Sequence, residues 1–113
     1  MNVKIYHNPR CQKSRLTLQL LQERGIEPVI IDYLNNPPSA EELDTLLQML
    51  AIEPRELMRK KETEYKGLAN ESLDRQTLIN AMVKYPILIE RPIVVANGKA
   101  MIGRPPEAVL SIL

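Results

Sequence analysis

The first third of the chain alternates between strand-like and helix-like hydrophobic patterns. Residues 3–6 alternate with period two and are followed by the turn-forming pair Asn8-Pro9. Leucines then recur at partly helical spacing over residues 13–24, and Gly25 is well placed to end that helix. Residues 29–31 form an apolar run typical of a buried strand. The pattern predicts a βαβ unit with parallel strands.

The middle of the chain predicts helices. Ser39 and Glu42 form a capping box for a helix to about residue 50. A short helix over residues 54–59 follows, since proline suits a first turn. Asp74 caps a third helix that ends before Pro86. Its apolar face consists of Leu78, Met82 and Tyr85.

The last part of the chain predicts a hairpin and a short helix. Two apolar runs, residues 92–95 and 100–102, flank Asn97-Gly98, the strongest local signal for a tight antiparallel turn. Pro105 and Pro106 open a final helix that runs to Leu113. The predicted order is therefore βαβ, several helices, then ββα.

Composition narrows the class of protein. With 113 residues, 44% of them hydrophobic and 26% charged, the chain fits one globular domain over residues 1–113. A net charge of +1 argues against a general nucleic-acid binder. No apolar stretch is long enough for a membrane span, and the N-terminus lacks the pattern of a signal peptide. We expect a cytoplasmic monomer without nucleic-acid or membrane partners.

The single cysteine, Cys11, lies just before the first predicted helix. Helix N–H groups and the helix dipole favour an anion there, and the side chains of Arg10, Lys13 and Arg15 add positive charge. His7 adds more charge when it is protonated. This setting predicts a reactive thiolate at neutral pH. With no second cysteine, any redox cycle must use a thiol from outside the chain.

Two neighbours of Cys11 exclude related thiol motifs. Thr17 stands where a phosphatase loop of this kind has its arginine, and Ser14 stands where a two-cysteine redox motif has its second thiol. The Ser14 hydroxyl therefore either caps the helix or donates a hydrogen bond to the thiolate.

Three arginines outside this segment are further candidates: Arg59, Arg91 and Arg104. Each one alone is typical of a solvated surface charge. In a thioredoxin-like arrangement, however, the loop before the hairpin faces the loop that carries the cysteine, and an Xaa-Pro bond there is commonly cis. Arg91, which precedes Pro92, is then directed toward Cys11.

Fragments along nearly the whole chain together resemble the glutaredoxin-dependent arsenate reductase (ArsC-like) family, in a short form that ends at Leu113 without a longer polar tail. They are His7-Asn8-Pro9, Cys11, Ser14-Arg15, residues 36–39, 57–60 and 86–89, Arg91-Pro92-Ile93-Val94 and Arg104-Pro105. The resemblance implies an α/β, thioredoxin-like fold: a mixed four-stranded sheet with an all-helical insertion between its two halves.

The same resemblance implies a function and roles for the residues of the site. Arsenate is reduced to arsenite, with electrons from glutathione as co-substrate and from glutaredoxin, and no cofactor is tightly bound. Cys11 is the nucleophile, and Arg59, Arg91 and Arg104 bind and stabilise the oxyanion. His7 supports the thiolate electrostatically. The loop around the substrate includes Asn8, Ser14 and Arg15.

Two other functions stay open at this point. One is a redox-responsive regulatory or partner-binding module that resembles Spx-type transcription regulators, although Ser14 argues against a disulfide switch. The other is a monothiol glutaredoxin-like oxidoreductase that uses Cys11 on glutathionylated proteins. Measurable reduction of arsenate would distinguish an arsenate reductase from both of these alternatives.

Overall fold

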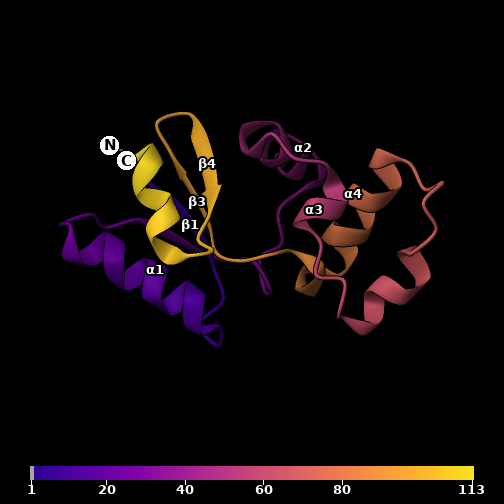
Figure 1. The fold of residues 1–113 in the computed structure, drawn as a ribbon, viewed down its shortest axis with the longest axis horizontal. Coiled ribbons are helices and arrows are strands. Elements are labelled where there is room, and N and C mark those ends of the chain that lie inside the picture. Colours follow the sequence, from indigo (N-terminus) through magenta and orange to yellow (C-terminus); the bar gives the residue numbers. More distant parts are fainter. Residues whose placement is uncertain (1) are drawn as a thin grey trace. The chain divides into compact units, whose positions relative to one another are not determined.

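The computed structural model describes residues 2–113, which form two compact units (Figure 1). Unit 1 consists of the chain up to Asn36 together with Arg91–Leu113, and unit 2 consists of Pro37–Glu90. The prediction of a single domain over residues 1–113 stays a prediction.

Unit 1 contains the predicted sheet. Its elements are β1 (Lys4–His7), α1 (Gln12–Glu23), β2 (Val29–Asp32), β3 (Ile93–Ala96), β4 (Lys99–Ile102) and the 3₁₀ helix η3 (Pro106–Ile112). The strand order is β2-β1-β3-β4, with β1 parallel to β2 and antiparallel to β3, and β3 antiparallel to β4. This confirms the βαβ and ββα halves and the mixed, thioredoxin-like sheet.

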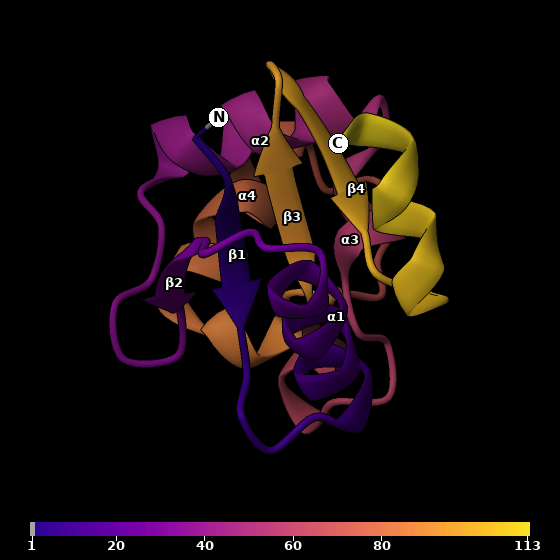
Figure 2. The same cartoon turned by 90° about the vertical axis from the view of Figure 1, so that its left-hand side faces the viewer.

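The core of unit 1 lies between the sheet and a layer formed by α1 and η3, which cover the same face (Figure 2). Side chains from all three parts are buried in it: Val3, Ile5, Leu21, Val94, Ala96, Val109 and Ile112. Aliphatic side chains of this kind supply most of the free energy of folding. The cluster fixes α1 against the sheet through Leu21, in the last turns of the helix.

The strand β2 is much more exposed than its apolar sequence predicts. Val29 is 61% exposed and Ile30 49% exposed, so the prediction of a buried strand was wrong. The reason is its place in the sheet: β2 is an edge strand, whereas α1 contacts β1 and η3 contacts β3 and β4. An apolar run indicates a strand but not what covers it.

The hairpin between β3 and β4 has the predicted tight turn. Asn97 and Gly98 have φ angles of 54° and 74°, the left-handed conformation that a two-residue turn of this type requires. The Asn97 side chain also donates a 2.9 Å hydrogen bond to the carbonyl of Ile112. The turn residue therefore ties the hairpin to η3.

Unit 2 is the predicted helical insertion. It consists of α2 (Ala40–Leu50), α3 (Pro54–Leu57), the 3₁₀ helix η1 (Thr63–Leu68), α4 (Arg75–Lys84) and the 3₁₀ helix η2 (Pro86–Leu88). The capping box of Ser39 and Glu42 and the cap by Asp74 are both present. Apart from one isolated bridge, between Met58 and Ile89, the described residues of this unit form no β structure.

Two details of unit 2 differ from the prediction. Helix α3 ends at Leu57, because Met58 has extended backbone and pairs with Ile89. Tyr85 lies beyond α4 and is 40% exposed, so it does not share the buried face of Leu78 and Met82.

Among residues 2–113, no helix has the length and apolar character needed to cross a membrane.

Candidate functional site

Cys11 is the N-cap residue of α1. Its backbone N–H donates a 3.0 Å hydrogen bond to the carbonyl of Asn8, and its own carbonyl accepts one of 3.0 Å from the N–H of Arg15. The side chain is half-buried and forms no disulfide. The backbone thus places the sulfur at the end of the helix where N–H groups lack intrahelical partners.

Several donors favour the ionised form of this thiol. Burial raises the pKa of Cys11, but hydrogen bonds from the backbone N–H groups of Ser14 and Lys13, and the hydrogen bond and positive charge of Arg91, act in the opposite direction. Their combined effect holds the pKa of Cys11 below its ordinary value. The predicted lowering of the thiol pKa is therefore present, with Arg91 as a specific cause.

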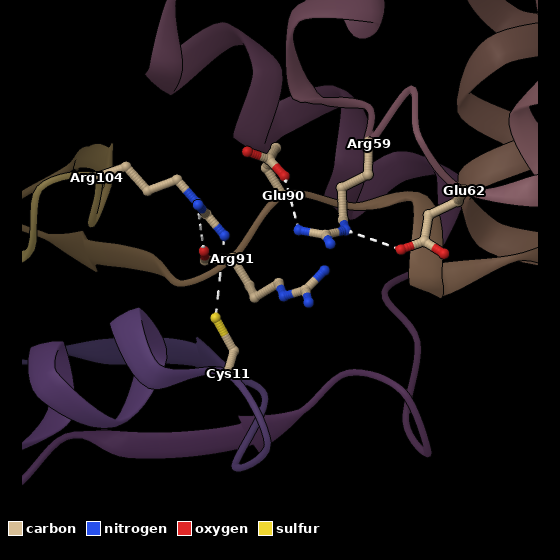
Figure 3. A network of polar contacts seen from close by, with 6 residues as sticks. All are labelled: Cys11, Arg59, Glu62, Glu90, Arg91 and Arg104. Atoms are coloured by element: carbon tan, nitrogen blue, oxygen red, sulfur yellow. Dashed lines mark hydrogen bonds and ion pairs between the residues drawn. The ribbon is translucent and has the colours of Figure 1, made fainter.

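Arg91 and Arg104 surround the sulfur as a linked pair (Figure 3). Nη2 of Arg104 lies 3.9 Å from Sγ of Cys11, and its Nε donates a 3.0 Å hydrogen bond to the carbonyl of Arg91. Within the described part of the chain, Nε and Nη1 of Arg91 are buried and have no hydrogen-bond partner. Unit 1 therefore brings together three of the predicted residues, and two guanidinium nitrogens of Arg91 carry N–H groups that no described residue accepts.

The Ser14 hydroxyl connects the end of β1 to α1. Its oxygen accepts a 3.0 Å hydrogen bond from the backbone N–H of Asn8 and shares one of 2.7 Å with Nδ1 of His7. Ser14 is fully buried, and this hydroxyl forms no cap of α1. Its backbone N–H, rather than its hydroxyl, is the group that contacts the Cys11 sulfur.

His7 contributes to this network as a neutral ring. Burial lowers its pKa most strongly; the Asp32 carboxylate raises it and the charge of Arg15 lowers it, which leaves the pKa of His7 below its ordinary value. Because the ring is then neutral at pH 7, it adds no full positive charge for the thiolate. Its visible contribution is the hydrogen bond with Ser14.

Asn8 and Arg15 stabilise the loop that ends at Cys11. Oδ1 of Asn8 accepts a 3.0 Å hydrogen bond from the backbone N–H of Arg10, and Nη1 of Arg15 donates one of 2.9 Å to the carbonyl of Pro9. Asn8 is buried, whereas Arg15 is exposed. Their predicted contacts with substrate stay predictions.

Arg59 belongs to unit 2 and is paired there with two carboxylates. Its Nε lies 3.2 Å from Glu62 and its Nη1 lies 3.2 Å from Glu90 (Figure 3). Its backbone N–H donates to the carbonyl of Leu88. The guanidinium is thus a positioned, partly buried group rather than a freely solvated charge. Its role in oxyanion binding stays a prediction.

Gly103 is a residue of the site that the sequence pattern did not single out. A Cβ at this position would lie 2.6 Å from Oγ1 of Thr17 and 2.7 Å from Cγ of Pro92. Thr17 is in the helix that begins after Cys11, and Pro92 directly follows Arg91. Only glycine lets the chain pass this closely between the two segments just before it reaches Arg104.

We expect Gly103→Ala to lower both stability and activity. The methyl group must displace Thr17 or Pro92, and overpacking of this kind costs about 1–3 kcal/mol. Urea unfolding measures the loss of stability. A lower kcat of the purified variant, for the reaction that uses the Cys11 thiol, would indicate that the thiol and the arginines have moved apart. The matched control is Gly67→Ala, since a Cβ there meets no described atom within 4 Å. Equal stability of the two variants would contradict this account.

The reaction of Cys11 should depend on pH in a defined direction. A thiol with a lowered pKa loses its proton at lower pH, so alkylation rises with pH and levels off earlier than for an ordinary cysteine. Rates of iodoacetamide alkylation across a pH series measure this inflection. The same protein in urea is the reference, and an inflection at or above that of the unfolded chain would contradict the lowered pKa.

Among residues 2–113, no group of three or more metal-ligating side chains is placed to hold a metal ion. Comparison with known proteins identifies the class of this cysteine site instead. The sequence profile of the ArsC family matches residues 6–112, nearly the whole chain. The chain belongs to the ArsC family.

Individual relatives match the chain over nearly its whole length. It is 60% identical to the Escherichia coli protein named "Uncharacterized protein YfgD", over 98% of this chain and 96% of that protein. It is 48% identical to an arsenate reductase of Haemophilus influenzae, over all of both chains. The solved structure of the arsenate reductase from Vibrio cholerae is 54% identical, with a TM-score of 0.97 over 100% of this chain and 98% of that one.

Proposed function

We propose that this ArsC protein is an arsenate reductase that uses Cys11 as its single nucleophile. The observation that carries the proposal is Arg91, whose Nε and Nη1 are buried without a partner in the described residues while its charge favours the Cys11 thiolate. Buried, unpartnered guanidinium donors are costly unless an anion accepts their hydrogen bonds. A thiolate beside such donors suits an oxyanion that a sulfur nucleophile attacks.

Arsenate matches these groups in charge and shape. It is a small tetrahedral oxyanion, and planar guanidinium groups bind such oxygens in pairs. Phosphate has nearly the same shape, so binding to these groups discriminates poorly between arsenate and phosphate. The chemistry separates them instead, because arsenic accepts a thiolate and is then reduced, whereas phosphorus is not.

In the first step, the Cys11 thiolate attacks arsenic. A sulfur–arsenic bond forms and an arsenic–oxygen bond breaks, and the oxygen leaves as water after it gains protons, so arsenic stays in the +5 state. Arg91 and Arg104 stabilise the charge on the remaining oxygens. As the family resemblance implies, Arg59 adds a third guanidinium, His7 supports the thiolate electrostatically, and Asn8, Ser14 and Arg15 belong to the loop around it.

The two electrons come from outside thiols, since Cys11 is the only cysteine. Glutathione attacks the arsenic adduct, forming a second sulfur–arsenic bond and displacing a second oxygen as water. The glutaredoxin thiol then attacks the glutathione sulfur: the disulfide forms, the glutathione–arsenic bond breaks, and its electron pair reduces arsenic to +3. Water finally displaces the Cys11 sulfur from arsenic, which releases arsenous acid and the Cys11 thiol. In total, one dihydrogen arsenate, two thiols and one proton yield arsenous acid, one disulfide and one water. The proposed setting is a cytoplasmic monomer without a tightly bound cofactor.

The test is arsenate reduction by the purified protein, with glutathione and with or without glutaredoxin. We expect arsenite to form only when arsenate, protein and thiol donors are all present, and excess phosphate to inhibit by competition. Glutathionylated peptide serves as the alternative substrate. Faster reduction of that mixed disulfide than of arsenate would favour a glutaredoxin-like oxidoreductase. Polymerase binding without any turnover of arsenate would favour a regulatory module.

A further inference from the structure

A cavity of unit 1 lies beside the loop that carries Cys11. It has a volume of about 260 Å³ and is lined by two short segments. One is Asn8, Pro9 and Arg10, and the other is Asp32, Leu34 and Asn35. Arg10, which lines one side of the cavity, directly precedes the nucleophile Cys11 in the sequence.

The sheet topology explains why these two segments meet. Strands β1 and β2 are parallel, and their last residues, His7 and Asp32, are paired in register. The loops that follow both strands therefore leave the sheet at the same edge.

The cavity presents one positive and one negative side chain. Arg10 is exposed and Asp32 is half-buried, and among residues 2–113 no ion pair joins them. One carboxylate oxygen of Asp32 accepts a 2.6 Å hydrogen bond from the side-chain amide of Asn35. The other carboxylate oxygen has no hydrogen bond in the described residues, so the cavity offers both an acceptor for an ammonium group and a cation for a carboxylate.

Volume limits what this cavity can hold. About 260 Å³ lies just below the range of about 300–1,000 Å³ that is typical of pockets for whole small-molecule ligands. A cavity of this size accommodates a small polar ligand or the polar end group of a larger one. An end group that carries an ammonium and a carboxylate on one carbon is the head of an α-amino acid.

We propose that this cavity binds the α-amino acid head of a γ-glutamyl thiol and directs its sulfur toward the adduct on Cys11. The inference rests on the proposed function, in which the sole cysteine needs an outside thiol. Arg10 binds the head carboxylate and Asp32 binds its ammonium group. In such a thiol, about two residue lengths, or roughly 7 Å, separate the head from the sulfur, whereas adjacent Cα atoms lie about 3.8 Å apart. A thiol of this length, bound by its head group at Arg10, is long enough to span the separation between Arg10 and the next residue in the chain, Cys11.

Binding is tested with S-methylglutathione, which keeps the head group but cannot react with arsenic. Titration into the ¹⁵N-labelled protein should shift the amide signals of Arg10, Asp32, Leu34 and Asn35. Arg10→Ala should weaken this binding by about tenfold or more, because a charge-assisted hydrogen bond is lost. The matched control is Arg24→Ala, an exposed arginine of the same unit outside the cavity. Equal affinities of the two variants would overturn the proposal.

A series of thiols tests which end of the molecule is recognised. During arsenate reduction, γ-glutamylcysteine should keep a KM within about threefold of that of glutathione, whereas cysteinylglycine, which lacks the head group, should show a KM about tenfold higher or more. Equal KM values for cysteinylglycine and glutathione would overturn the subsite.

The two proposals fail in different ways. Binding of S-methylglutathione is read without turnover. If it binds at these residues but no thiol supports arsenate reduction, the proposed function is wrong and the subsite is supported. If arsenate is reduced and Arg10→Ala leaves the KM for glutathione unchanged, the subsite is wrong and the proposed function stands.

Discussion

Cys11→Ser is expected to lower arsenate reduction by at least about four orders of magnitude, the scale of nucleophile loss in other enzymes. The serine hydroxyl is almost entirely protonated at neutral pH, so it is a poor nucleophile. An oxygen–arsenic ester would in any case exchange with water and return arsenate, because alkoxide ligands on arsenic(V) are readily hydrolysed. Arsenite production with glutathione and glutaredoxin measures the effect.

The fold should survive this substitution. Cys11 is half-buried and forms no disulfide, so the stability measured by urea unfolding should stay close to that of the parent protein. The variant should also still bind phosphate, since Arg91 and Arg104 remain. Arsenite formation above about one-hundredth of the parent rate would show that Cys11 is not the nucleophile, because loss of a true nucleophile costs far more than that.

Arg91→Ala is expected to lower kcat by about 10²- to 10³-fold, the typical loss for one preorganised donor to a developing oxyanion. The same substitution should raise the pKa of the Cys11 thiol, because a hydrogen bond and a positive charge that favour the thiolate are removed. The inflection of the alkylation rate then moves to higher pH. Both readouts use the same purified variant.

Stability and a second substitution separate catalysis from structure. Nε and Nη1 of Arg91 are buried without partners in the described residues, so alanine should leave the free energy of unfolding unchanged or increase it. Arg91→Lys retains the charge but loses the planar pair of donors, so most of the effect on the thiol pKa should be restored while kcat stays low. A kcat for Arg91→Ala within threefold of the parent, with an unmoved inflection, would reject the role of Arg91.

Side-chain hydrogen bonds fix the loop between β1 and α1, and this loop positions the backbone donors around Cys11. Ser14, Asn8 and Arg15 use side-chain groups to hold the backbone between β1 and α1. The backbone N–H groups of Ser14 and Lys13 then point at the sulfur. Preorganised donors of this kind need no rearrangement when charge develops, which is the source of their effect on rate.

Local sequence signals determined the secondary structure because each acts over a few residues. The capping box of Ser39 and Glu42, the cap by Asp74 and the Asn97-Gly98 turn depend only on neighbouring backbone groups, and all three form as predicted. The position of Cys11 at the start of α1 follows in the same way. The order of elements, together with the family resemblance, then predicted the mixed sheet and the helical insertion.

Tertiary structure alone decided what depends on segments far apart in the chain. The exposure of Val29 and Ile30 follows from the edge position of β2, which an apolar run cannot reveal. The contact of Arg104 with Cys11 joins residues 93 positions apart, and the close passage of Gly103 between Thr17 and Pro92 exists only once the sheet and α1 are assembled. Propensity and capping are local energies, whereas burial, unpartnered donors and close packing are properties of the assembled chain.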